Sequence, residues 1–572
     1  MPLSDTRDGP KPPRTPARGQ IQPAEINEAS GAASGPAKPG APAGLLYGLA
    51  VFVSAFLLFQ VQPLIAKIIL PWFGGSSSVW TICLLFFQVV LLLGYLYAHG
   101  LTRLLGPRAQ TRIHLVLLAL GILVLPIVPK DAWKPSGPGS PALHILLLLG
   151  ATVGLPYFLL STSSPLLQAW YAAGRAGAKP YRLFALSNAG SMLALVTHPV
   201  LVEPFFATRH QAIGWSLGFG GFAGLGAIVA LRSRGEALPR PLSDPQPRPG
   251  RRVQALWVAL TACSSTLLLA VTSHLSQNVA AIPFLWILPL SLYLLSFILC
   301  FEGRGWYRRG LVLRLFAVAV GGMAYALSAE SAHMPLGVLI PLYSAGLFLC
   351  CMACHGELAR LKPAPQHLTS FYLMCSLGGA LGGVFAGLLA PHLFSGYFEL
   401  PIGLGACTVL VLIVLHSDPS SMFYRARWQP AWLVLVLLTA ILMGDLVLEI
   451  RNSSADADVA VRNFYGTLRV IDDDDSAPEE ATRWLMNGTI THGKEFLDPS
   501  RRRQPTTYYG PNSGVGLALR WAGRRGKLRV GVIGLGAGTL AAYGRPGDHY
   551  VFYEINPLVI ELANTEFYFL KD

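Results

Sequence analysis

Long apolar runs separated by short polar segments fill the chain from about Leu45 to Leu448. A helix needs roughly 20 mostly apolar residues to cross the hydrocarbon core of a bilayer. Most of the runs reach that length, and the pattern therefore predicts a polytopic α-helical membrane bundle of about thirteen spans. We expect these spans at residues 43–66, 79–101, 111–129, 142–163, 182–203, 211–231, 254–273, 282–301, 311–328, 334–354, 368–392, 397–416 and 430–449.

A polar break after the sixth span, RSRGEALPRPLSDPQPRPGRR at 232–252, divides the bundle into two halves of six. The halves echo each other: RLFALSNAGSMLALVTHP (182–199) and SFYLMCSLGGALGGVFAGLLAP (370–391) each have an aromatic run followed by small residues. Small residues allow close approach of helix backbones in a membrane. An even number of spans per half predicts parallel repeats related by an axis along the membrane normal, as in major-facilitator transporters.

Composition and charge fit this picture. Charged residues make up 13% of the chain, against about 25% in soluble domains. The net charge of +14 lies outside the tail, which carries 15 basic and 15 acidic residues from Arg451 onward. Because the surplus is spread over loops, no nucleic-acid partner is expected. Alternate loops hold most of the basic residues, which predicts a cytoplasmic N-terminus. Thirteen spans would then place the tail outside, unless one span does not cross.

Polar residues at membrane depth are costly and tend to face a cavity or the bundle interior. The candidate intramembrane site comprises Gln60, Gln62, His274, Gln277 and Asn278. It would form a small-molecule pathway between the halves. The alternative is that several of these groups lie at span ends, near headgroup water. For Lys67 and Glu203 we favour the alternative, a role in pinning helix ends.

The eight cysteines all lie in or beside apolar runs, and none is in the tail, so a secreted disulfide framework is not indicated. CMACH at 351–355 matches the pattern for covalent haem attachment. The predicted topology puts it at the inner end of a span, on the wrong side for that chemistry. We expect it to serve in packing, with neither haem nor metal bound.

The pattern of apolar and polar residues changes after Arg451. NFYGTLRVI (463–471) and TRWLMNGTI (482–490) are strand-like, and a helix is plausible over 508–521. LRVGVIGLGAGTLAAYGRPGDHYVFYEINP (528–557) then predicts strand, glycine turn, short helix, strand and acidic residue, the start of a nucleotide-binding α/β domain.

The glycine turn holds Gly534, Gly536 and Gly538, and Glu554 closes the second strand. Only glycine lets a ligand come into contact with the backbone there, and a following helix would offer free N–H groups. A carboxylate at the end of the second strand can accept the ribose hydroxyls of a nucleoside. A dinucleotide site wants glycine where Thr539 stands, so S-adenosylmethionine-type nucleosides are favoured. The alternative is a glycine turn in an unrelated α/β domain.

The tail motifs NFYGTLRV, LMNGTITHG, YYGPNSGVGLAL, VGVIGLGAGTLAAY and YEINPLVIELA resemble the spermidine synthase (polyamine aminopropyltransferase) family. FQVQPLIAKIILPWFGGSSSVW, VTSHLSQNVAAIPFLWILPLSLYLLSF and CHGELARLKPAPQHLTSFYLMCSLGGALGG look like the membrane signatures of bacterial proteins that fuse such a domain to a multi-span bundle. The resemblance covers nearly everything after residue 43. It implies a bacterial inner-membrane protein whose tail is a β subdomain followed by a methyltransferase-like (Rossmann-type) α/β domain.

By position, the resemblance implies that Gly534, Gly536 and Gly538 approach the methionine end of decarboxylated S-adenosylmethionine or S-adenosylmethionine, and that Glu554 holds the ribose. The candidate residues on the substrate side are His492, Tyr508 and Tyr509. Soluble synthases have Tyr-His-Glu where this chain has Tyr508-Tyr509-Gly510, so polyamine recognition departs from the pattern. Their catalytic aspartate would come after Asp572, and we expect a truncated, inactive enzyme domain with no catalytic residue in the chain.

These expectations divide the chain into seven segments. They are a disordered N-terminal segment (1–42), a first membrane half (43–231), a basic linker (232–253), a second membrane half (254–416), a connecting segment with one further span (417–450), a β segment with a helix (451–527) and a partial nucleoside-binding domain (528–572).

Three functions follow as hypotheses. The first is a protein held in the lipid bilayer that transfers an aminopropyl (or methyl) group from a nucleoside of the S-adenosylmethionine type to a small-molecule amine. The second is a major-facilitator-like transporter of a small organic solute, polyamine or amino-acid-like, whose tail is sensory or vestigial. The third is an interaction role without chemistry.

Overall fold

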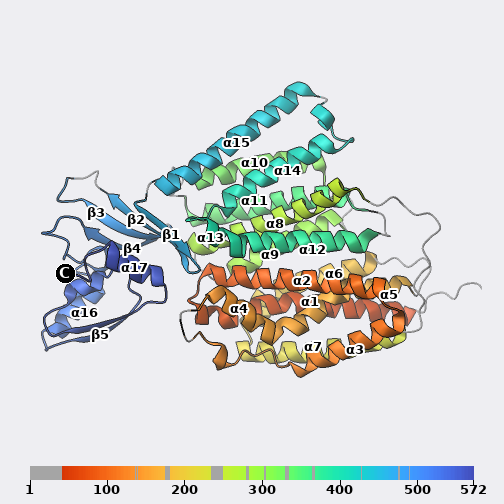
Figure 1. Cartoon of the computed structure of the whole chain (residues 1–572), viewed down its shortest axis with the longest axis horizontal. Helices are drawn as coiled ribbons and strands as arrows, with labels where there is room; N and C mark the ends of the chain where they lie inside the picture. Colours follow the sequence, from red (N-terminus) through yellow and green to blue (C-terminus); the bar gives the residue numbers. More distant parts are fainter. Residues whose placement is uncertain are drawn as a thin grey trace, which may run out of the picture.

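A computed structural model describes residues 41–135, 137, 139–173, 181–233, 249–278, 283–301, 305–328, 334–363, 367–426, 428–455, 457–473, 477–488 and 490–572. The predicted disordered segment and most of the basic linker lie outside these residues. A bundle of roughly parallel helices makes up most of the structure, and a small α/β tail lies against one end of it (Figure 1).

The first half of the bundle contains six helical segments, two of them interrupted by π-helical turns. They are α1 (Ala41–Ile69), α2 (Ser77–Leu104), α3 (Pro107–Leu123), α4 (Pro141–Leu149) continuing through η3 (Gly150–Gly154) into α5 (Leu155–Ala173), α6 (Tyr181–Thr197) with η4 (His198–Val202), and α7 (Thr208–Ser233). Two short 3-10 helices, η1 (Leu70–Phe73) and η2 (Asp131–Trp133), lie in its loops.

The second half also contains six segments. They are α8 (Arg251–Asn278), α9 (Pro283–Phe301), α10 (Arg309–Leu327), α11 (Leu336–Arg360), α12 (Leu368–Val384) with η7 (Phe385–Leu389) and α13 (Ala390–Leu393), and α14 (Glu399–Ser417). After η8 (Tyr424–Ala426), α15 (Gln429–Ala455) leads to the tail along the outside of α10 and α14. Its exposed apolar side chains suit contact with lipid.

Twelve helices among the described residues are long and apolar enough to cross a membrane. The third predicted span, 111–129, corresponds to α3, which is not among these twelve; it has 17 residues and packs against α5 and α7 inside the first half. The prediction of a multi-span helical membrane protein is therefore confirmed.

The two halves repeat the same packing. In the first half α1 packs against α6, α2 against α5 and α1 against α7; in the second half α8 packs against α12, α9 against α11 and α8 against α14. Between the halves, α2 packs against α12 and α6 against α9. Exchanging the halves turns the first of these contacts into the second. The helices are therefore related by an approximate two-fold axis along the bundle, as parallel repeats require.

The fifth segments of the two halves match in finer detail. α6 and α12 both have 17 residues, and each continues into a five-residue π-helix, η4 and η7. These are the two segments whose sequences echo each other. A π-turn inserted at the same place in both halves supports the internal repeat.

Glycines set the close packing of these segments on the first helix of each half. A Cβ on Gly190 of α6 would lie 2.6 Å from the backbone oxygen of Phe52 in α1. A Cβ on Gly382 of α12 would lie 2.5 Å from the backbone oxygen of Ala262 in α8. Without a hydrophobic drive between helices in lipid, such close backbone approach supplies the packing energy.

The tail begins with a four-stranded antiparallel sheet in the order β1-β2-β3-β4, made of β1 (Val459–Asn463), β2 (Gly466–Asp473), β3 (Thr482–Asn487) and β4 (Ile490–Phe496). The predicted strand over 482–490 is wrong in its second part, where the chain turns into β4. Asn487-Gly488 is a hairpin signal, and Gly488 adopts a φ of +59°, which favours glycine.

The rest of the tail contains η9 (Thr507–Tyr509), α16 (Gly514–Gly523), β5 (Arg529–Ile533), η10 (Thr539–Tyr543), β6 (His549–Tyr553) and α17 (Pro557–Thr565). β5 and β6 pair in parallel as a two-stranded sheet. Two strands do not make a methyltransferase-like domain, whose parallel sheet is covered on both faces. That part of the predicted fold is not shown by the structure.

Candidate functional site

A cavity of about 240 Å³ lies between the two halves of the bundle, lined by α1, α2, α5 and α6 from one half and by α8, α9 and α12 from the other. Its polar side chains are hydroxyls and amides, with four tyrosines among them. They are Ser54, Gln62, Gln88, Tyr95, Tyr157, Ser161, Ser164, Ser187, Asn188, Ser191, Thr261, Tyr293, Tyr372 and Ser376. A concave, largely apolar site with a few convergent polar groups is the usual form of a small-molecule site.

Of the predicted intramembrane residues, Gln62 lines this cavity. Its side chain is buried and donates to the hydroxyl of Tyr157 at 3.2 Å. Gln60 lines a separate pocket on the outside of the first half, beside α6 and α7. Residues two apart on a helix do not share a face, so the two glutamines serve different surroundings.

The remaining predicted residues lie near the tail end of α8, away from the cavity. The ring of His274 packs on Tyr343 with centroids 4.5 Å apart. Gln277 has a buried Nε2 without a hydrogen-bond partner among the described residues. Asn278 ends α8, and its side chain lies outside the described residues. Lys67 and Glu203 form an ion pair between the ends of α1 and η4, as expected for a helix-pinning role.

Toward the tail the cavity is closed by contacts between the halves, which we call the tail-side closure: Trp80 and Thr81 of α2, Ser273 of α8 and Trp286 of α9. The two indoles are fully buried and stacked, with centroids 5.1 Å apart. The hydroxyls of Thr81 and Ser273 are 3.2 Å apart. In the other direction the cavity reaches Tyr372 and Cys375, near the start of α12.

Sequence reasoning missed the tryptophan pair, although a signal existed. Trp80 is the fourth residue of α2 and Trp286 the fourth residue of α9, the second segments of the two halves. Under the two-fold repeat these positions are equivalent, so the pair lies on the axis. An internal alignment of the halves would have brought the two residues into register.

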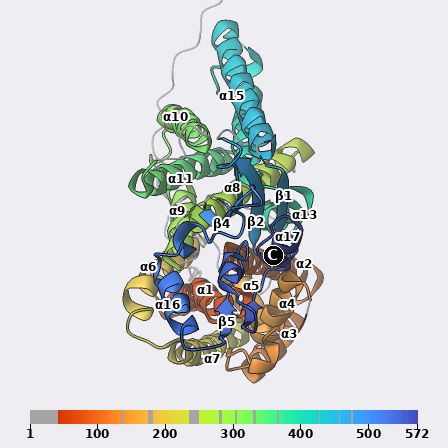
Figure 2. The same cartoon turned by 90° about the vertical axis from the view of Figure 1, so that its left-hand side faces the viewer.

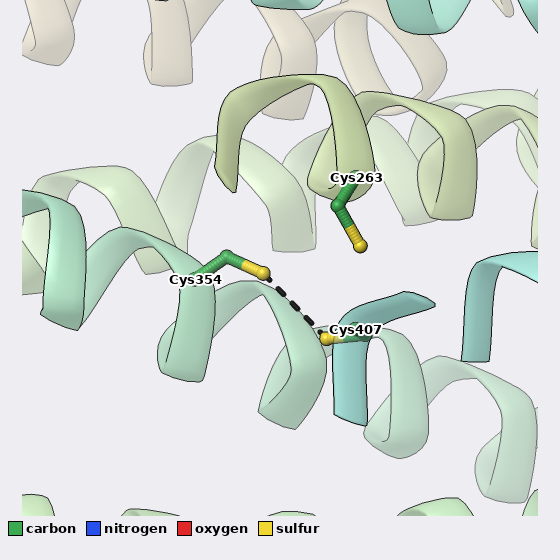
Figure 3. Close-up of side chains that lie close together, drawn as sticks. All are labelled: Cys263, Cys354 and Cys407. Atoms are coloured by element: carbon green, nitrogen blue, oxygen red, sulfur yellow. Dashed lines mark hydrogen bonds between the residues drawn. The ribbon is translucent and has the colours of Figure 1, made fainter. Parts of the chain in front are cut away.

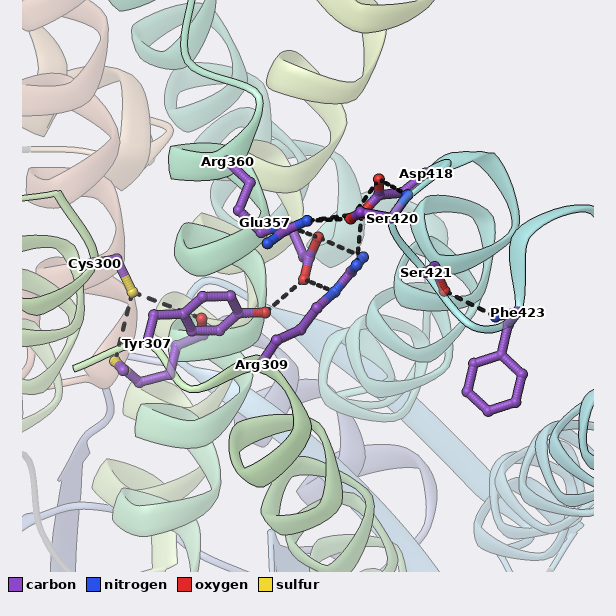
Figure 4. A network of polar contacts seen from close by, with 10 residues as sticks. Cys300, Tyr307, Arg309, Glu357, Arg360, Asp418, Ser420, Ser421 and Phe423 are labelled. Carbon is purple, nitrogen blue, oxygen red and sulfur yellow. Dashed lines mark hydrogen bonds and ion pairs between the residues drawn. The ribbon is translucent and has the colours of Figure 1, made fainter. Parts of the chain in front are cut away.

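A polar network fastens the opposite end of the second half (Figure 4). The guanidinium of Arg309 in α10 donates two hydrogen bonds of 2.8 and 3.0 Å to the carboxylate of Glu357 in α11. It also donates to the carboxylate of Asp418, after α14, at 2.5 Å. Tyr307 donates to Glu357 at 2.6 Å, and Arg360 donates to Asp418 at 3.0 Å. Such bidentate pairs hold α10, α11 and the end of α14 together as one unit.

Three buried cysteines from different helices also come together. The sulfurs of Cys263, Cys354 and Cys407 lie within 4.8 Å of one another, and those of Cys354 and Cys407 are 3.6 Å apart (Figure 3). Soft metal ions take three thiolates, but a charged thiolate centre in the middle of a membrane bundle needs a compensating charge. We interpret the thiols as small packing groups. His355 of the CMACH motif is engaged by Ser264 and Ser296 at 3.2 and 2.9 Å, which favours packing there too.

In the tail, Gly534, Gly536 and Gly538 all have positive φ, at +91°, +57° and +85°, as the glycine turn requires. A Cβ on Gly536 would lie 2.6 Å from the backbone oxygen of His492. The carboxylate of Glu554 accepts the backbone N–H groups of Leu535 and Asn556, each at 2.9 Å. It therefore fixes the turn to the end of β6.

Of these residues, Gly536, Glu554 and Asn556 line a pocket of about 290 Å³ together with His492 and the Gly74–Ser76 loop of the bundle. Burial lowers the pKa of His492, while Glu554 opposes that shift. The rings of Tyr508 and Tyr509 lie outside this pocket and pack on each other in a tilted arrangement, with centroids 4.4 Å apart. The short helix predicted after the glycine turn is η10, a five-residue 3-10 helix whose N-cap is Gly538 and which ends before Gly544-Arg545-Pro546-Gly547.

No protein-family model matches the chain, and no curated protein matches its sequence. Among solved structures, the bundle is similar to the inward-open xylose transporter XylE from E. coli, with 12% identity, a TM-score of 0.44, and coverage of 67% of this chain and 98% of that one. It is also similar to the peptide transporter POT in complex with alafosfalin, with 14% identity, a TM-score of 0.42, and coverage of 66% of this chain and 94% of that one. A third similar structure is the nucleoside transporter NupG, with 12% identity, a TM-score of 0.37, and coverage of 70% of this chain and 99% of that one.

The first functional expectation, an aminopropyltransferase of the spermidine synthase class, is contradicted. The structures found to be similar are those of solute transporters, and the matches cover between 66% and 70% of this chain. In the tail, the Glu554 carboxylate accepts two backbone N–H groups, and β5 and β6 form a two-stranded parallel sheet among the described residues.

Proposed function

We propose that the protein is a transporter that moves a small organic solute across the membrane by alternating access. The observation that carries the proposal is the cavity, with its convergent hydroxyls and amides, on the two-fold axis between two equivalent six-helix halves. In proteins with this symmetry the solute site lies at the repeat interface near the bilayer midplane.

Rocking of the halves would expose the cavity to one side at a time. The structure represents a state closed at the tail end by the stacked indoles and the Thr81–Ser273 contact. Opening that end requires these four side chains to separate. The Arg309–Glu357–Asp418 network and the close glycine contacts allow each half to move as a rigid body.

The membrane orientation follows from charge. The tail contacts the loops before α2 and before α14, whereas Arg103, Arg232, Arg252 and Arg360 lie at helix ends on the opposite side of the bundle. Cytoplasmic loops carry an excess of basic residues. We therefore place the basic end and the N-terminus in the cytoplasm, and the tail on the outer side of a bacterial inner membrane. In this proposal α3 crosses the membrane as well as the twelve longer helices, and thirteen crossings put the N-terminus and the tail on opposite sides.

The test is solute uptake by the full chain in proteoliposomes, with a panel of radiolabelled small solutes, against empty liposomes. Saturable uptake supports transport. A second test uses a Trp80→Cys/Trp286→Cys variant, in which cross-linking of the two closure positions should abolish uptake reversibly. Uptake that is unchanged when the halves are cross-linked would rule out alternating access through this cavity.

A further inference from the structure

The cavity contains many hydrogen-bonding groups and, among the described residues that line it, no ionisable Asp, Glu, Lys, Arg or His side chain. The ion pairs of the bundle lie elsewhere: Lys67–Glu203 at the tail end of the first half, and the Arg309–Glu357 network at the far end of the second. The chemistry of the cavity is therefore that of neutral donors and acceptors.

From this lining we infer, on the basis of the proposed transport function, that the solute is uncharged, rich in hydrogen-bonding groups and partly apolar or ring-shaped. A cationic or anionic solute would lose its hydration on entering the cavity, where no side chain of opposite charge replaces it among the described lining residues. The desolvation free energy of a charge is large in a largely apolar cavity. A polyamine or a zwitterion meets the same obstacle. An uncharged polyol, monosaccharide or nucleoside can exchange its water contacts for hydroxyls and amides.

The polar groups converge from both halves, as recognition of one solute requires. Gln62 and Asn188 come from the first half, and Tyr293 and Ser376 come from the second. The hydroxyl of Ser376 and the Oε1 of Gln88 are buried without a partner among the described residues, so they have capacity to bind a solute. The aromatic faces of Tyr95 and Tyr372 offer surfaces for a ring.

The experiment measures counterflow in proteoliposomes with a panel of xylose, glycerol, uridine, spermidine, lysine, glycine and citrate. We expect uptake of at least one uncharged member and none of the charged or zwitterionic members. Gln62→Leu should raise the half-saturation concentration about 3- to 10-fold, the effect of losing one hydrogen bond. Gln60→Leu is the matched control, because it lies two residues away on the same helix and faces another pocket, and it should leave uptake unchanged.

Uptake limited to charged members would overturn the inference and leave the transport function standing. Equal effects of Gln62→Leu and Gln60→Leu on uptake of a neutral solute would also overturn the assignment of the cavity. If the wild-type protein takes up no member of the panel and none raises its melting temperature, the transport function itself fails.

A second inference rests on a separate observation, the way the tail is attached. The turn between β1 and β2, residues Arg462–Tyr465, contacts both halves of the bundle, and we call it the bridging hairpin. Figure 2 looks onto this end of the bundle, where the tail lies. A cavity of about 800 Å³ separates the tail from the bundle, and both Thr81 and Ser273 of the tail-side closure line it.

On the second half, the hairpin makes a buried ion pair. Arg462 reaches Glu399 of α14 at 2.5 Å and the backbone oxygen of Gly396 at 2.6 Å, and its guanidinium lies 4.1 Å from the ring centroid of Tyr397. The side chains of Arg462 and Glu399 are 5% and 6% exposed, so water does not screen the pair.

On the first half, the hairpin packs on the loop between α1 and α2. The hydroxyl of Ser76 donates to the backbone oxygen of Phe464 at 3.4 Å. The ring of Tyr465 lies against Gly74, where a Cβ would come within 3.2 Å of it. Gly74 has a φ of +81°, so both its backbone conformation and the nearby ring of Tyr465 favour glycine at this position.

Because Arg462 and Tyr465 are only three positions apart in the chain, the hairpin cannot stretch when the halves move apart. We propose that the tail is a clamp that holds the tail side of the transporter closed. Opening requires the hairpin to release one half, and the buried Arg462–Glu399 pair sets the resistance on one side.

The clamp is tested by hydrogen–deuterium exchange of the full chain, in which the exchange rates of residues 77–81 and 270–274 are measured. Arg462→Met and Glu399→Gln should each raise exchange at both places about tenfold or more. Arg483→Met is the matched control: it breaks the Arg483–Asp472 pair inside the tail and does not touch the bundle, and it should leave these segments at the wild-type rate. The exchanged pair Arg462→Glu/Glu399→Arg should restore protection.

The clamp would be overturned if Arg462→Met raised the exchange of β1 but left exchange at the tail-side closure at the wild-type rate. An equal rise in Arg483→Met would also overturn it, because general loosening of the tail would then suffice. Retained protection of α10 and α11 in each variant shows that the bundle is folded.

Discussion

A substitution at Gly382 tests the close approach of α8 and α12, on which the repeat depends. In Gly382→Ala the new methyl group would lie 2.5 Å from the backbone oxygen of Ala262 and 2.9 Å from the Cβ of Ser265. Relaxed C–H···O contacts have C···O distances of about 3.3–3.6 Å, so the helices must move apart by roughly 1 Å. Both obstructing groups belong to helix α8 and have little freedom to move.

Overpacking of this kind costs about 1–3 kcal/mol. Alanine in place of a helix-interior glycine stabilises by about 0.5–1 kcal/mol, which offsets part of that cost. Gly379→Ala, one turn earlier on the same helix, carries the propensity gain alone, because nothing lies within 4 Å of its added Cβ. The difference between the two variants therefore isolates the overpacking cost, about 1–3 kcal/mol.

The assay is thermal unfolding of the purified protein in detergent. We expect Gly382→Ala to melt below Gly379→Ala by a few degrees, since about 1 kcal/mol shifts the melting temperature by roughly 2–4 °C in domains of 150–250 residues and by less in larger ones. Under the repeat, Gly190→Ala in α6 should behave like Gly382→Ala, with Gly214→Ala, whose Cβ meets nothing within 4 Å, as its control. Melting of Gly382→Ala at or above Gly379→Ala would refute the reasoning.

Three further predictions follow from the described contacts. Trp80→Ala and Trp286→Ala should open the tail-side closure equally, and hydrogen exchange at residues 77–81 should rise in both variants. A rise in exchange in one variant alone would contradict the two-fold placement of the pair. A small methanethiosulfonate reagent should modify Cys375, which lines the cavity, while Cys354 and Cys407 react after unfolding; mass spectrometry of tryptic peptides distinguishes the sites, and early modification of Cys354 would contradict its burial. Burial of the Glu495 carboxyl in the tail raises its pKa from 4.5 to about 7, so the folded tail holds a proton there that the unfolded chain loses above about pH 4.5. The stability of the tail should therefore fall as pH rises from 4.5 to 7, by up to about 1.4 kcal/mol per pH unit, and Glu495→Gln should flatten that slope in pulse proteolysis; an unchanged slope would assign it to another group.

The sequence by itself determined where the helices lie and how they group. Apolar runs of membrane length, the basic linker and the echo between 182–199 and 370–391 specified two halves of six, since span length and helix spacing are local properties of the chain. The glycine turn at Gly534, Gly536 and Gly538 was also readable, because a positive φ is a local demand on residue type.

The tertiary structure alone decided which polar residues share a site. Gln60 and Gln62 are neighbours in sequence and lie in different pockets, whereas Trp80 and Trp286 are far apart in sequence and stack on the axis. Likewise Glu554, whose position suggested a ribose ligand, binds the backbone of its own turn. The physical reason is that a helix fixes the spacing of its side chains but not its rotation or its partners, which are set by the packing of all the other helices.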